Sequence, residues 1–257
     1  MRVLLNEVAP GVAAPGDRVD GARLARLYAY PDRAAHRPWV RANFVSTLDG
    51  AVTGADGRSG SINTGADRAV FSLLRALSDV IVAGAQTARA EEYRRARTAP
   101  AWRGARRPDQ RPHPVVAVVS RSAKLPPTLL EPCDDAGEVL LLTCRAAGAD
   151  ALARAREALG GDRVVVFDGD HVAPADALRE LAGRGLHRVL CEGGPHLLHD
   201  MVAADLLDEL CLTLAPRLVA GDHLRLLAGA PLDRGFAPRL VVESEGTLAG
   251  RWQRRRP

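Results

Sequence analysis

The chain has 257 residues, of which 47% are hydrophobic and 26% are charged. This balance is typical of a globular protein that buries a large core without disulfides or metals. The formal net charge of +4 would suit a nucleic-acid partner, but only 4% of the residues are aromatic, too few for obvious base-stacking surfaces. Lys124 is the only lysine among 35 basic residues, so the arginine content indicates codon bias rather than a phosphate-binding face. We therefore expect no nucleic-acid partner.

Cysteine spacing and apolar runs exclude further classes of protein. Cys133, Cys144, Cys191 and Cys211 have no metal-ligand or redox spacing, so we expect no metal site, and buried reduced thiols at the last three. No apolar run approaches the ~20 residues that span a bilayer, and the first run ends too early for a signal peptide. These features predict a soluble cytoplasmic protein with no membrane partner.

Residues 1–36 are rich in proline, glycine and alanine and are predicted to form an N-terminal arm with one short helix near residues 23–28. Residues 37–257 are predicted to form one domain, because no linker or repeat divides them. Apolar β-branched runs predict strands at residues 39–45, 80–83, 115–119, 139–143, 164–167, 188–191 and 210–214. Periodicity and helix-start signals predict helices from Thr64 to Leu77 and at residues 149–159, 173–182 and 195–203. The segment from Arg94 to Arg111, with seven arginines and no periodicity, is predicted to be a solvated surface excursion.

Alternating strands and helices predict an α/β fold with a mostly parallel central sheet and helices on both faces. Closing strands at residues 240–243 and 248–253, around Gly246, are expected to add an antiparallel C-terminal hairpin. Ligands of such sheets bind beyond the carboxyl ends of the strands. Polar residues that directly follow predicted strands are therefore the first candidates for a site.

The strongest local signal is Glu192-Gly193-Gly194-Pro195, which joins an apolar strand to a helix. Free N–H groups and the helix dipole at such a helix start suit an anion, for example the pyrophosphate of a dinucleotide. The glycines allow a ligand to approach the main chain closely. On these grounds alone, an ordinary strand-to-helix turn with a solvated glutamate remains the alternative.

Two other strand ends have weaker signals. Asp49 lies in the turn that ends the first strand, and the stretch from Gly84 to Glu91 places hydroxyl and arginine side chains after the second. Each could be a plain turn when taken alone. The Rossmann and P-loop fingerprints, the serine nucleophile elbow and the zinc-deaminase ligand set are absent from the sequence.

Taken together, six stretches in order resemble the reductase domain of the riboflavin-biosynthesis enzymes. The likeness covers about residues 37–245, and the matching stretches are residues 37–50, 59–64, 73–79, 84–91, 192–195 and 208–210. Actinobacterial single-domain members are especially similar, since they share an N-terminal element like Leu27–Pro31. The resemblance implies a dihydrofolate-reductase-like fold, NADPH as hydride donor, a homodimer, and reduction of a ribosylamino-pyrimidine 5′-phosphate to its ribitylamino product.

The resemblance also implies roles for individual residues. Asp49 and Glu192 would be catalytic, with Asp49 between cofactor and substrate. The substrate would contact Asn43, Ser59, Arg75 and Glu192, with Arg75 at its phosphate. The cofactor-binding set would be Ser61, Thr87, Glu91, Gly193, Gly194, His196 and Leu197; for His196, a bystander role is the alternative.

Three departures from the family pattern bear on the substrate. Asn43 stands where bacterial two-domain enzymes usually have lysine. Archaeal and fungal-type reductases resemble this chain in having asparagine there, so the contact with the pyrimidine can differ from that of the bacterial enzymes. We expect no deaminase domain ahead of the reductase stretch, so that any deamination would be the task of another protein. The ending Glu91–Arg95 departs from the usual acidic-then-proline pattern, which leaves the role of Glu91 open. The alternatives are a reductase of a dihydropterin, dihydrofolate or another heterocycle, and a non-catalytic nucleotide-binding protein.

Overall fold

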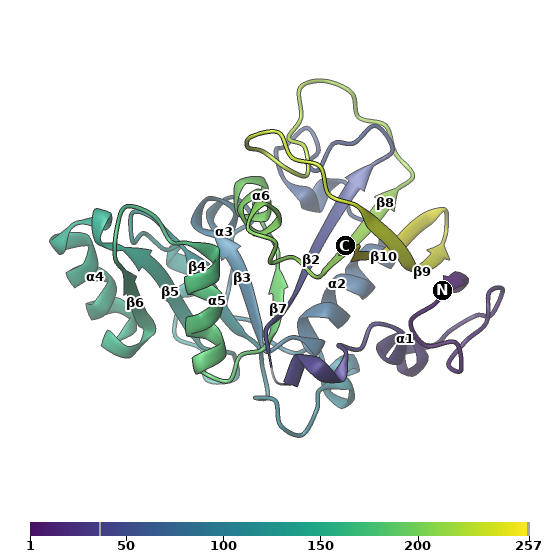
Figure 1. The fold of residues 1–257 in the computed structure, drawn as a ribbon, viewed down its shortest axis with the longest axis horizontal. Helices are drawn as coiled ribbons and strands as arrows, with labels where there is room; N and C mark the ends of the chain where they lie inside the picture. Colours follow the sequence, from purple (N-terminus) through teal and green to yellow (C-terminus); the bar gives the residue numbers. More distant parts are fainter. Residues whose placement is uncertain (36, 256–257) are drawn as a thin grey trace.

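The computed structural model describes residues 1–35 and 37–255. Within them, ten strands form one sheet in the order β1-β9-β10-β8-β2-β7-β3-β4-β5-β6 (Figure 1). The seven parallel strands are β2 (Trp39–Thr47), β3 (Val80–Gly84), β4 (Val115–Val119), β5 (Val139–Cys144), β6 (Val164–Phe167), β7 (Arg188–Cys191) and β8 (Glu209–Ala215). Antiparallel pairing adds β10 (Thr247–Arg254), β9 (Phe236–Ser244) and β1 (Arg2–Asn6).

Strand β7 lies between β2 and β3, although it comes much later in the chain. Its last residue, Cys191, is in register with Ala42 of β2 and Val82 of β3. Glu192, the next residue, therefore leaves the sheet in the middle of the row of parallel strand ends.

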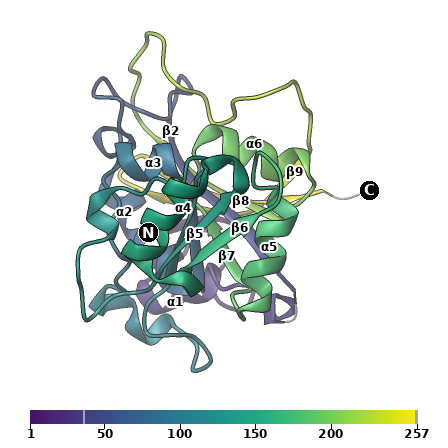
Figure 2. The same ribbon diagram turned by 90° about the vertical axis from the view of Figure 1, so that its left-hand side faces the viewer.

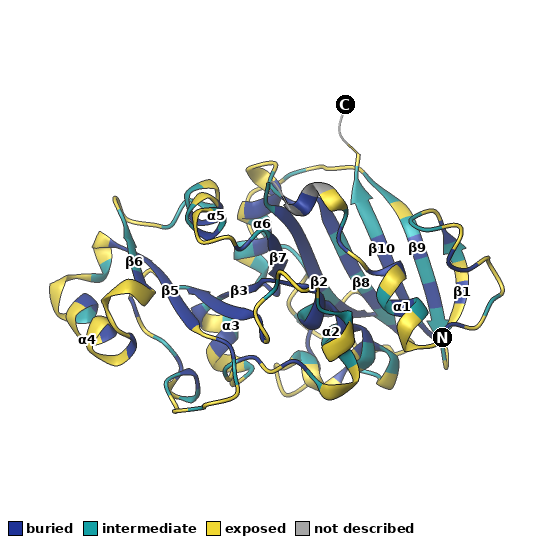
Figure 3. Cartoon of the chain, turned by 90° about the horizontal axis from the view of Figure 1, so that it is seen from below, coloured by how far each residue is buried: buried dark blue, intermediate teal, exposed yellow. Residues whose placement is uncertain are grey.

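Helices cover both faces of the sheet (Figures 2 and 3). One core cluster includes apolar residues of α1 (Gly21–Leu27), α2 (Gly65–Leu77), α3 (Ala85–Ala90) and α4 (Ala149–Leu159). A second cluster, on the other face, includes those of α5 (Pro174–Gly183) and α6 (Pro195–Ala203). Successive strand residues alternate between the clusters: Trp39 of β2 lies in the first, and Val40 in the second.

Helix α2 is built as its sequence pattern predicts. The Thr64 side chain accepts a hydrogen bond from the backbone N–H of Asp67 and caps the helix, which stabilises such a helix by about 1 kcal/mol. Val70, Leu73 and Leu77 are buried against the sheet. The predicted α/β class, with a mostly parallel sheet, helices on both faces and a C-terminal hairpin, is confirmed.

Residues 1–35 are more closely integrated than the arm expected from the sequence. Strand β1 pairs with β9 at the edge of the sheet, and Leu27 and Tyr28 are fully buried. The pairing joins segments from opposite ends of the chain, so no local pattern in the first residues could indicate it.

A buried ion cluster ties this N-terminal segment to the sheet. Glu209 on β8 lies 2.5 Å from Nε of Arg41 on β2 and 2.6 Å from Nη2 of Arg251 on β10. Arg41 donates to the carbonyl of Tyr28 at 2.8 Å, and Arg251 donates to that of Leu27. Burial raises the pKa of Glu209, but the two guanidinium groups outweigh it and hold the value at about 2. We call these three charged residues the Glu209 cluster.

The segment from Arg94 to Arg111 lies at the surface, as predicted, with most of its arginines exposed, but two of its polar side chains anchor it to α2. Arg106 donates to the carbonyl of Ser78 at 3.0 Å, and Gln110 donates to that of Leu77 at 3.0 Å. These side chains satisfy carbonyls at the C-terminal end of α2, where a helix lacks its own donors. Composition indicated exposure, but long polar side chains can bond to buried backbone while the chain itself stays near the surface.

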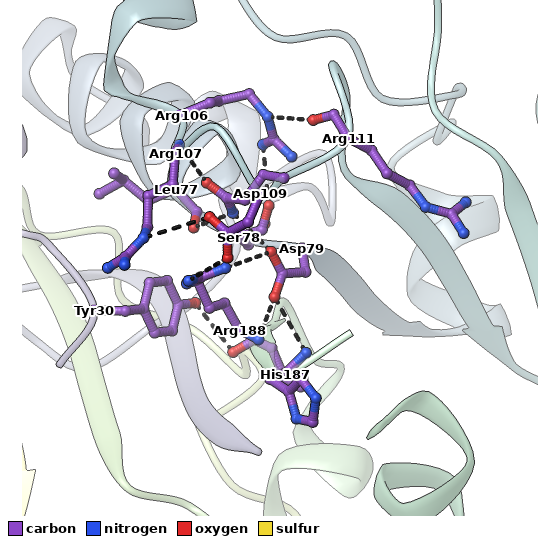
Figure 4. A network of polar contacts seen from close by, with 12 residues as sticks. Tyr30, Leu77, Ser78, Asp79, Arg106, Arg107, Asp109, Arg111, His187 and Arg188 are labelled. Carbon is purple, nitrogen blue, oxygen red and sulfur yellow. Dashed lines mark hydrogen bonds and ion pairs between the residues drawn. The ribbon is translucent and has the colours of Figure 1, made fainter. Parts of the chain in front are cut away.

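Asp79 extends this network to the start of β7 (Figure 4). Its Oδ2 accepts the backbone N–H groups of His187 at 3.1 Å and Arg188 at 2.8 Å. The Arg188 guanidinium lies 3.2 Å from Oδ1. These contacts fix β7 beside β3 at the amino ends of the strands, so the carboxyl ends remain available for a ligand.

The described part of the chain has no helix long and apolar enough to cross a membrane. In the same residues, no group of three or more side chains has an arrangement suited to a metal ion. Cys144, Cys191 and Cys211 are buried free thiols, as predicted.

Candidate active site

A cavity of about 1550 Å³ opens at the carboxyl ends of the central parallel strands. Its wall includes Asn43 of β2, Gly84 of β3, Ser120 after β4 and Glu192 after β7. Pockets for one small ligand typically measure ~300–1,000 Å³. The volume therefore suffices for two ligands side by side at the strand ends.

Glu192 is held in the cavity wall by two side chains. Arg75 of α2 forms two parallel hydrogen bonds with it, Nε to Oε1 at 2.8 Å and Nη2 to Oε2 at 2.7 Å. The Tyr93 hydroxyl donates to Oε2 at 2.5 Å. Burial and the neighbouring charge of Glu192 raise the pKa of Tyr93 well above 10.0, so this hydroxyl keeps its proton. Oε1 accepts only one of these bonds and retains capacity for a ligand donor.

Three residues of α2 at a spacing of four line the cavity together. They are Asp67, Phe71 and Arg75, and this spacing places side chains on one helix face. The Arg75 guanidinium lies over the Phe71 ring, 4.3 Å from its centroid. Asp67 is only 3% exposed, and its Oδ1 has no hydrogen-bond partner in the described structure. The buried Oδ1 of Asn63, just before the helix, also has no hydrogen-bond partner in the described structure.

The turn after Glu192 forms another wall of the cavity. Gly193 has φ +85°, and a Cβ there would lie 2.7 Å from the Phe44 ring. A Cβ on Gly194 would lie 2.6 Å from Oγ1 of Thr87. The turn therefore requires glycine at both positions and brings the start of α6 against α3, with Gly194, His196 and Leu197 lining the cavity. Such a helix start presents backbone N–H groups to an anion.

Basic side chains are common along the cavity wall. Arg89, Arg94, Arg95, Arg97 and Arg121 line it. Arg94 is paired with Glu131 at 2.5 Å, whereas the buried Nε of Arg95 has no hydrogen-bond partner among the described residues. Arginine forks suit phosphate oxygens, so this wall favours phosphorylated ligands.

The sequence and the fold were compared with known proteins. The model of the RibD C-terminal domain family matches residues 38–247. The chain belongs to this family. A 2,5-diamino-6-ribosylamino-4(3H)-pyrimidinone 5′-phosphate reductase of Methanothermobacter thermautotrophicus is 31% identical over 216 residues, 82% of this chain and 94% of the relative. The enzyme of the same name from Archaeoglobus fulgidus is 27% identical over 186 residues, 72% of this chain and 83% of the relative.

A pyrimidine reductase-like protein from Corynebacterium diphtheriae has a similar fold, with a TM-score of 0.80 and 22% identity. The alignment covers 93% of this chain and all of that one. This likeness shows that this member of the RibD C-terminal domain family shares its fold with that protein.

Most of the expected site residues lie in the cavity wall. Asn43, Ser59, Arg75, Thr87, Glu91, Glu192, Gly194, His196 and Leu197 line it, and Gly193 forms the adjoining turn. Ser59 and Glu91 are directly linked, because the Ser59 backbone N–H donates to the Glu91 carboxylate at 2.9 Å. The roles given to these residues remain predictions.

Asp49 and Ser61 lie elsewhere, contrary to expectation. Neither belongs to the cavity wall. Asp49 accepts hydrogen bonds from the Thr47 hydroxyl and the backbone N–H of Ala220, which hold its pKa at about 2. The Ser61 hydroxyl donates to Asp56 at 2.7 Å. Short polar side chains often bond to their own turn, and that local bonding withdraws both from the cavity.

Arg75 lines the cavity, and its expected role at the substrate phosphate stays a prediction. Nε and Nη2 are both committed to Glu192, so its main contact is with a carboxylate of the protein. Sequence reasoning missed Tyr93, Phe71, Asn63 and Asp67 as parts of the cavity. The spacing of residues 67, 71 and 75 could have indicated two of them. Residues four apart share one face of a helix, and Arg75 was already expected to belong to the site.

Proposed function

We propose that this RibD C-terminal domain protein is an NADPH-dependent reductase that converts a ribosylamino-pyrimidine 5′-phosphate into its ribitylamino product. The observation that carries the proposal is a large cavity whose wall includes both Glu192 and the glycine turn before α6. Its volume of about 1550 Å³ suits a dinucleotide and a nucleotide-sized substrate together. The names of the two archaeal relatives support the same reaction.

The walls fit a nicotinamide dinucleotide. The absence of a side chain at Gly194, whose Cβ would lie 2.6 Å from Oγ1 of Thr87, brings α3 close to the start of α6, where the pyrophosphate would bind. His196 and Leu197 would hold the pyrophosphate with their backbone N–H groups. Arg121 and Ser122, which line the cavity beyond β4, would hold the 2′-phosphate that distinguishes NADPH from NADH.

The substrate would occupy the part of the cavity bounded by α2 and Glu192. The free capacity of Glu192 Oε1 would accept a sugar hydroxyl, and Arg75 and Tyr93 would keep that carboxylate in place. Arg95, with its unpartnered Nε, and Ser59 would bind the 5′-phosphate. Binding of both ends would fix the sugar carbon C1′ relative to the cofactor, which is a proximity effect.

The chemistry needs no nucleophile from the protein. Bound NADPH would supply the hydride that adds to C1′ of the open-chain imine form of the substrate, while the imine nitrogen takes up one proton. Glu192 would stabilise the positive charge of the protonated imine. Enclosure between α2, α3 and the turn before α6 would keep water from the reacting atoms.

The test is NADPH oxidation by the purified chain with 2,5-diamino-6-ribosylamino-4(3H)-pyrimidinone 5′-phosphate, followed by identification of the ribitylamino product. We expect turnover with this compound and none with dihydrofolate. Turnover of dihydrofolate alone would support the alternative substrate class. Absence of NADPH binding by calorimetry would contradict an oxidoreductase.

The remaining expectations from the resemblance belong to this proposal. The protein would act in the cytoplasm as a homodimer on a small-molecule substrate, without nucleic acid. Sedimentation of the purified chain measures its assembly state, and a monomer at micromolar concentration would contradict that part of the proposal.

A further inference from the structure

The cavity contains an acidic side chain that the proposed mechanism does not use. Asp67 is 3% exposed and lines the cavity. The Thr213 hydroxyl of β8 acts to lower the pKa of this carboxylate, while Oδ1 has no hydrogen-bond partner among the described residues. A buried polar atom without a partner is costly, so a ligand donor at this position would stabilise the site.

The surroundings of Asp67 define the kind of ligand that fits. Phe71, one turn further along α2, supplies an aromatic ring, and Asn63 supplies a second buried acceptor without a partner. Val45 of β2 is in register with Thr213, and Asn43 lies on the same face of that strand two residues earlier. A flat heterocycle that presents N–H groups along one edge matches this set of acceptors.

The length of α2 between Asp67 and Arg75 sets how far the surroundings of Asp67 lie from Glu192. Asp67 and Arg75 are eight residues apart, which corresponds to about 12 Å along a helix axis. Arg75 holds Glu192, the proposed sugar contact. A ring at Asp67 and Phe71 would therefore direct its sugar toward Glu192.

We propose that Asp67, assisted by Asn63, recognises the 2-amino-4-oxo edge of the pyrimidine and thereby selects a substrate that retains the amino group at C2. In such a ring, N3–H and the 2-amino group are adjacent donors, and both can bond to one carboxylate. In the 2-oxo ring, a carbonyl replaces the amino group and its lone pairs face the carboxylate. A site built for a donor rejects the analogue that lacks it.

This inference rests on the proposed function, and it deepens that proposal by assigning the substrate class. Burial raises the pKa of Asp67, and Thr213 and Arg68 oppose the rise only in part. Donors on a ligand favour the charged form of a carboxylate, so the N–H groups of a 2-amino substrate would supply the donor that Oδ1 of Asp67 lacks among the described residues.

The test compares two substrates that differ only at C2, the 2-amino-pyrimidinone and the corresponding pyrimidinedione ribosylamino 5′-phosphates. We expect the unmodified protein to favour the 2-amino compound by roughly 100-fold or more in kcat/KM. Asp67→Asn offers one acceptor and one donor, which match N3–H and a 2-carbonyl. This variant should lose at least about 10-fold on the 2-amino compound and favour the 2-oxo compound.

Asp150→Asn is the matched control, because Asp150 is an exposed carboxylate in the first turn of α4. It should keep the preference of the unmodified protein. Asp67→Ser is made in parallel, so that the conclusion does not depend on one variant folding. An unmodified protein that favours the 2-oxo compound, or an Asp67→Asn variant that keeps the original preference, would overturn the inference while leaving the reductase assignment intact.

A second measurement separates recognition of the ring from reduction. Calorimetry with 2,5,6-triamino-4-pyrimidinone and with 5,6-diaminouracil measures binding of the rings without chemistry. If the unmodified protein reduces neither sugar phosphate, the proposed reaction fails, but selective binding of the 2-amino ring that Asp67→Asn abolishes would still support the inference. Equal binding of both rings would contradict it.

Discussion

At the scale of single residues, Glu192 is the side chain on which the proposed reaction depends most. Glu192→Gln removes the charge that Arg75 and Tyr93 hold in position, so kcat/KM should fall by about 100-fold, comparable to the loss of one stabilising group in other active sites. Tyr93→Phe removes one hydrogen bond to a charged group, and roughly 10-fold is expected. Steady-state kinetics measures both.

The control for these variants is Glu180→Gln. Glu180 of α5 pairs at 2.7 Å with Arg184, which directly follows the helix, and neither residue lines the cavity, so activity should not change. Retention of most of the activity by Glu192→Gln would remove this glutamate from the mechanism.

Arg121 gives a second expectation at the residue scale. Arg121→Ala should raise the KM for NADPH about 10-fold and affect NADH little, because one charged contact to a phosphate contributes about 1.5–3 kcal/mol. Arg145→Ala is the comparison, since Arg145 is an exposed arginine paired with Asp168 at 2.5 Å. An equal rise in KM for both coenzymes would show that Arg121 does not contact the 2′-phosphate.

At the scale of elements, the turn between β7 and α6 requires space that only glycine leaves. Gly194→Ala places a methyl group 2.6 Å from Oγ1 of Thr87, and such overpacking costs about 1–3 kcal/mol. Combining it with Thr87→Ala should recover part of that loss. Chemical denaturation of the two single variants and the double variant measures the coupling.

Gly104→Ala serves as the neutral comparison, because no atom lies within 4 Å of a Cβ there. If the effects of Gly194→Ala and Thr87→Ala on the free energy of unfolding are additive, the turn must move away from α3 to make room for the added methyl group.

The sequence was a good guide to elements with their own local pattern. The parallel strands are contiguous apolar runs, and α2 has a cap and an apolar face, so both kinds were predicted nearly at their observed bounds. Strand β1 was missed because its stability comes from β9, near the other end of the chain. The Arg94–Arg111 segment lies at the surface as predicted, but its bonds to α2 could not be foreseen because they depend on tertiary position.

The same distinction applies to the site. Glu192, Thr87 and the glycine turn follow strands directly, so sheet topology alone brings them together. Asp67 was interpreted only as part of a helix start, because its burial becomes evident only when α2 packs against the sheet. Asp49 has a residue type and a position that are typical of a site, but its carboxylate oxygens accept hydrogen bonds from its own turn and from the loop at residues 219–220.

At the scale of the whole molecule, the Glu209 cluster makes stability depend on pH. Its two arginines lower the pKa of Glu209 from 4.5 to about 2. The corresponding stability is fully present above pH 4.5 and is lost as the pH falls toward 2, with a magnitude of about 3 kcal/mol. Chemical denaturation at a series of acidic pH values measures this loss.

Glu209→Gln tests the origin of the effect. It leaves Arg41 and Arg251 buried without their counter-charge, so it should destabilise the protein by about 3–5 kcal/mol at neutral pH. The variant should also lose less stability than the unmodified protein on acidification. An identical acid dependence in the two proteins would assign the loss to other carboxylates.

The position of β7 between β2 and β3 has a consequence for synthesis on the ribosome. The two strands that flank it are made early, yet neither can complete its hydrogen-bonding edge until residues 188–191 emerge. A nascent chain that stops short of that point exposes two unpaired strand edges, which are templates for aggregation. The candidate active-site cavity, whose wall includes the residue that follows β7, can therefore form only after residues 188–191 have been made.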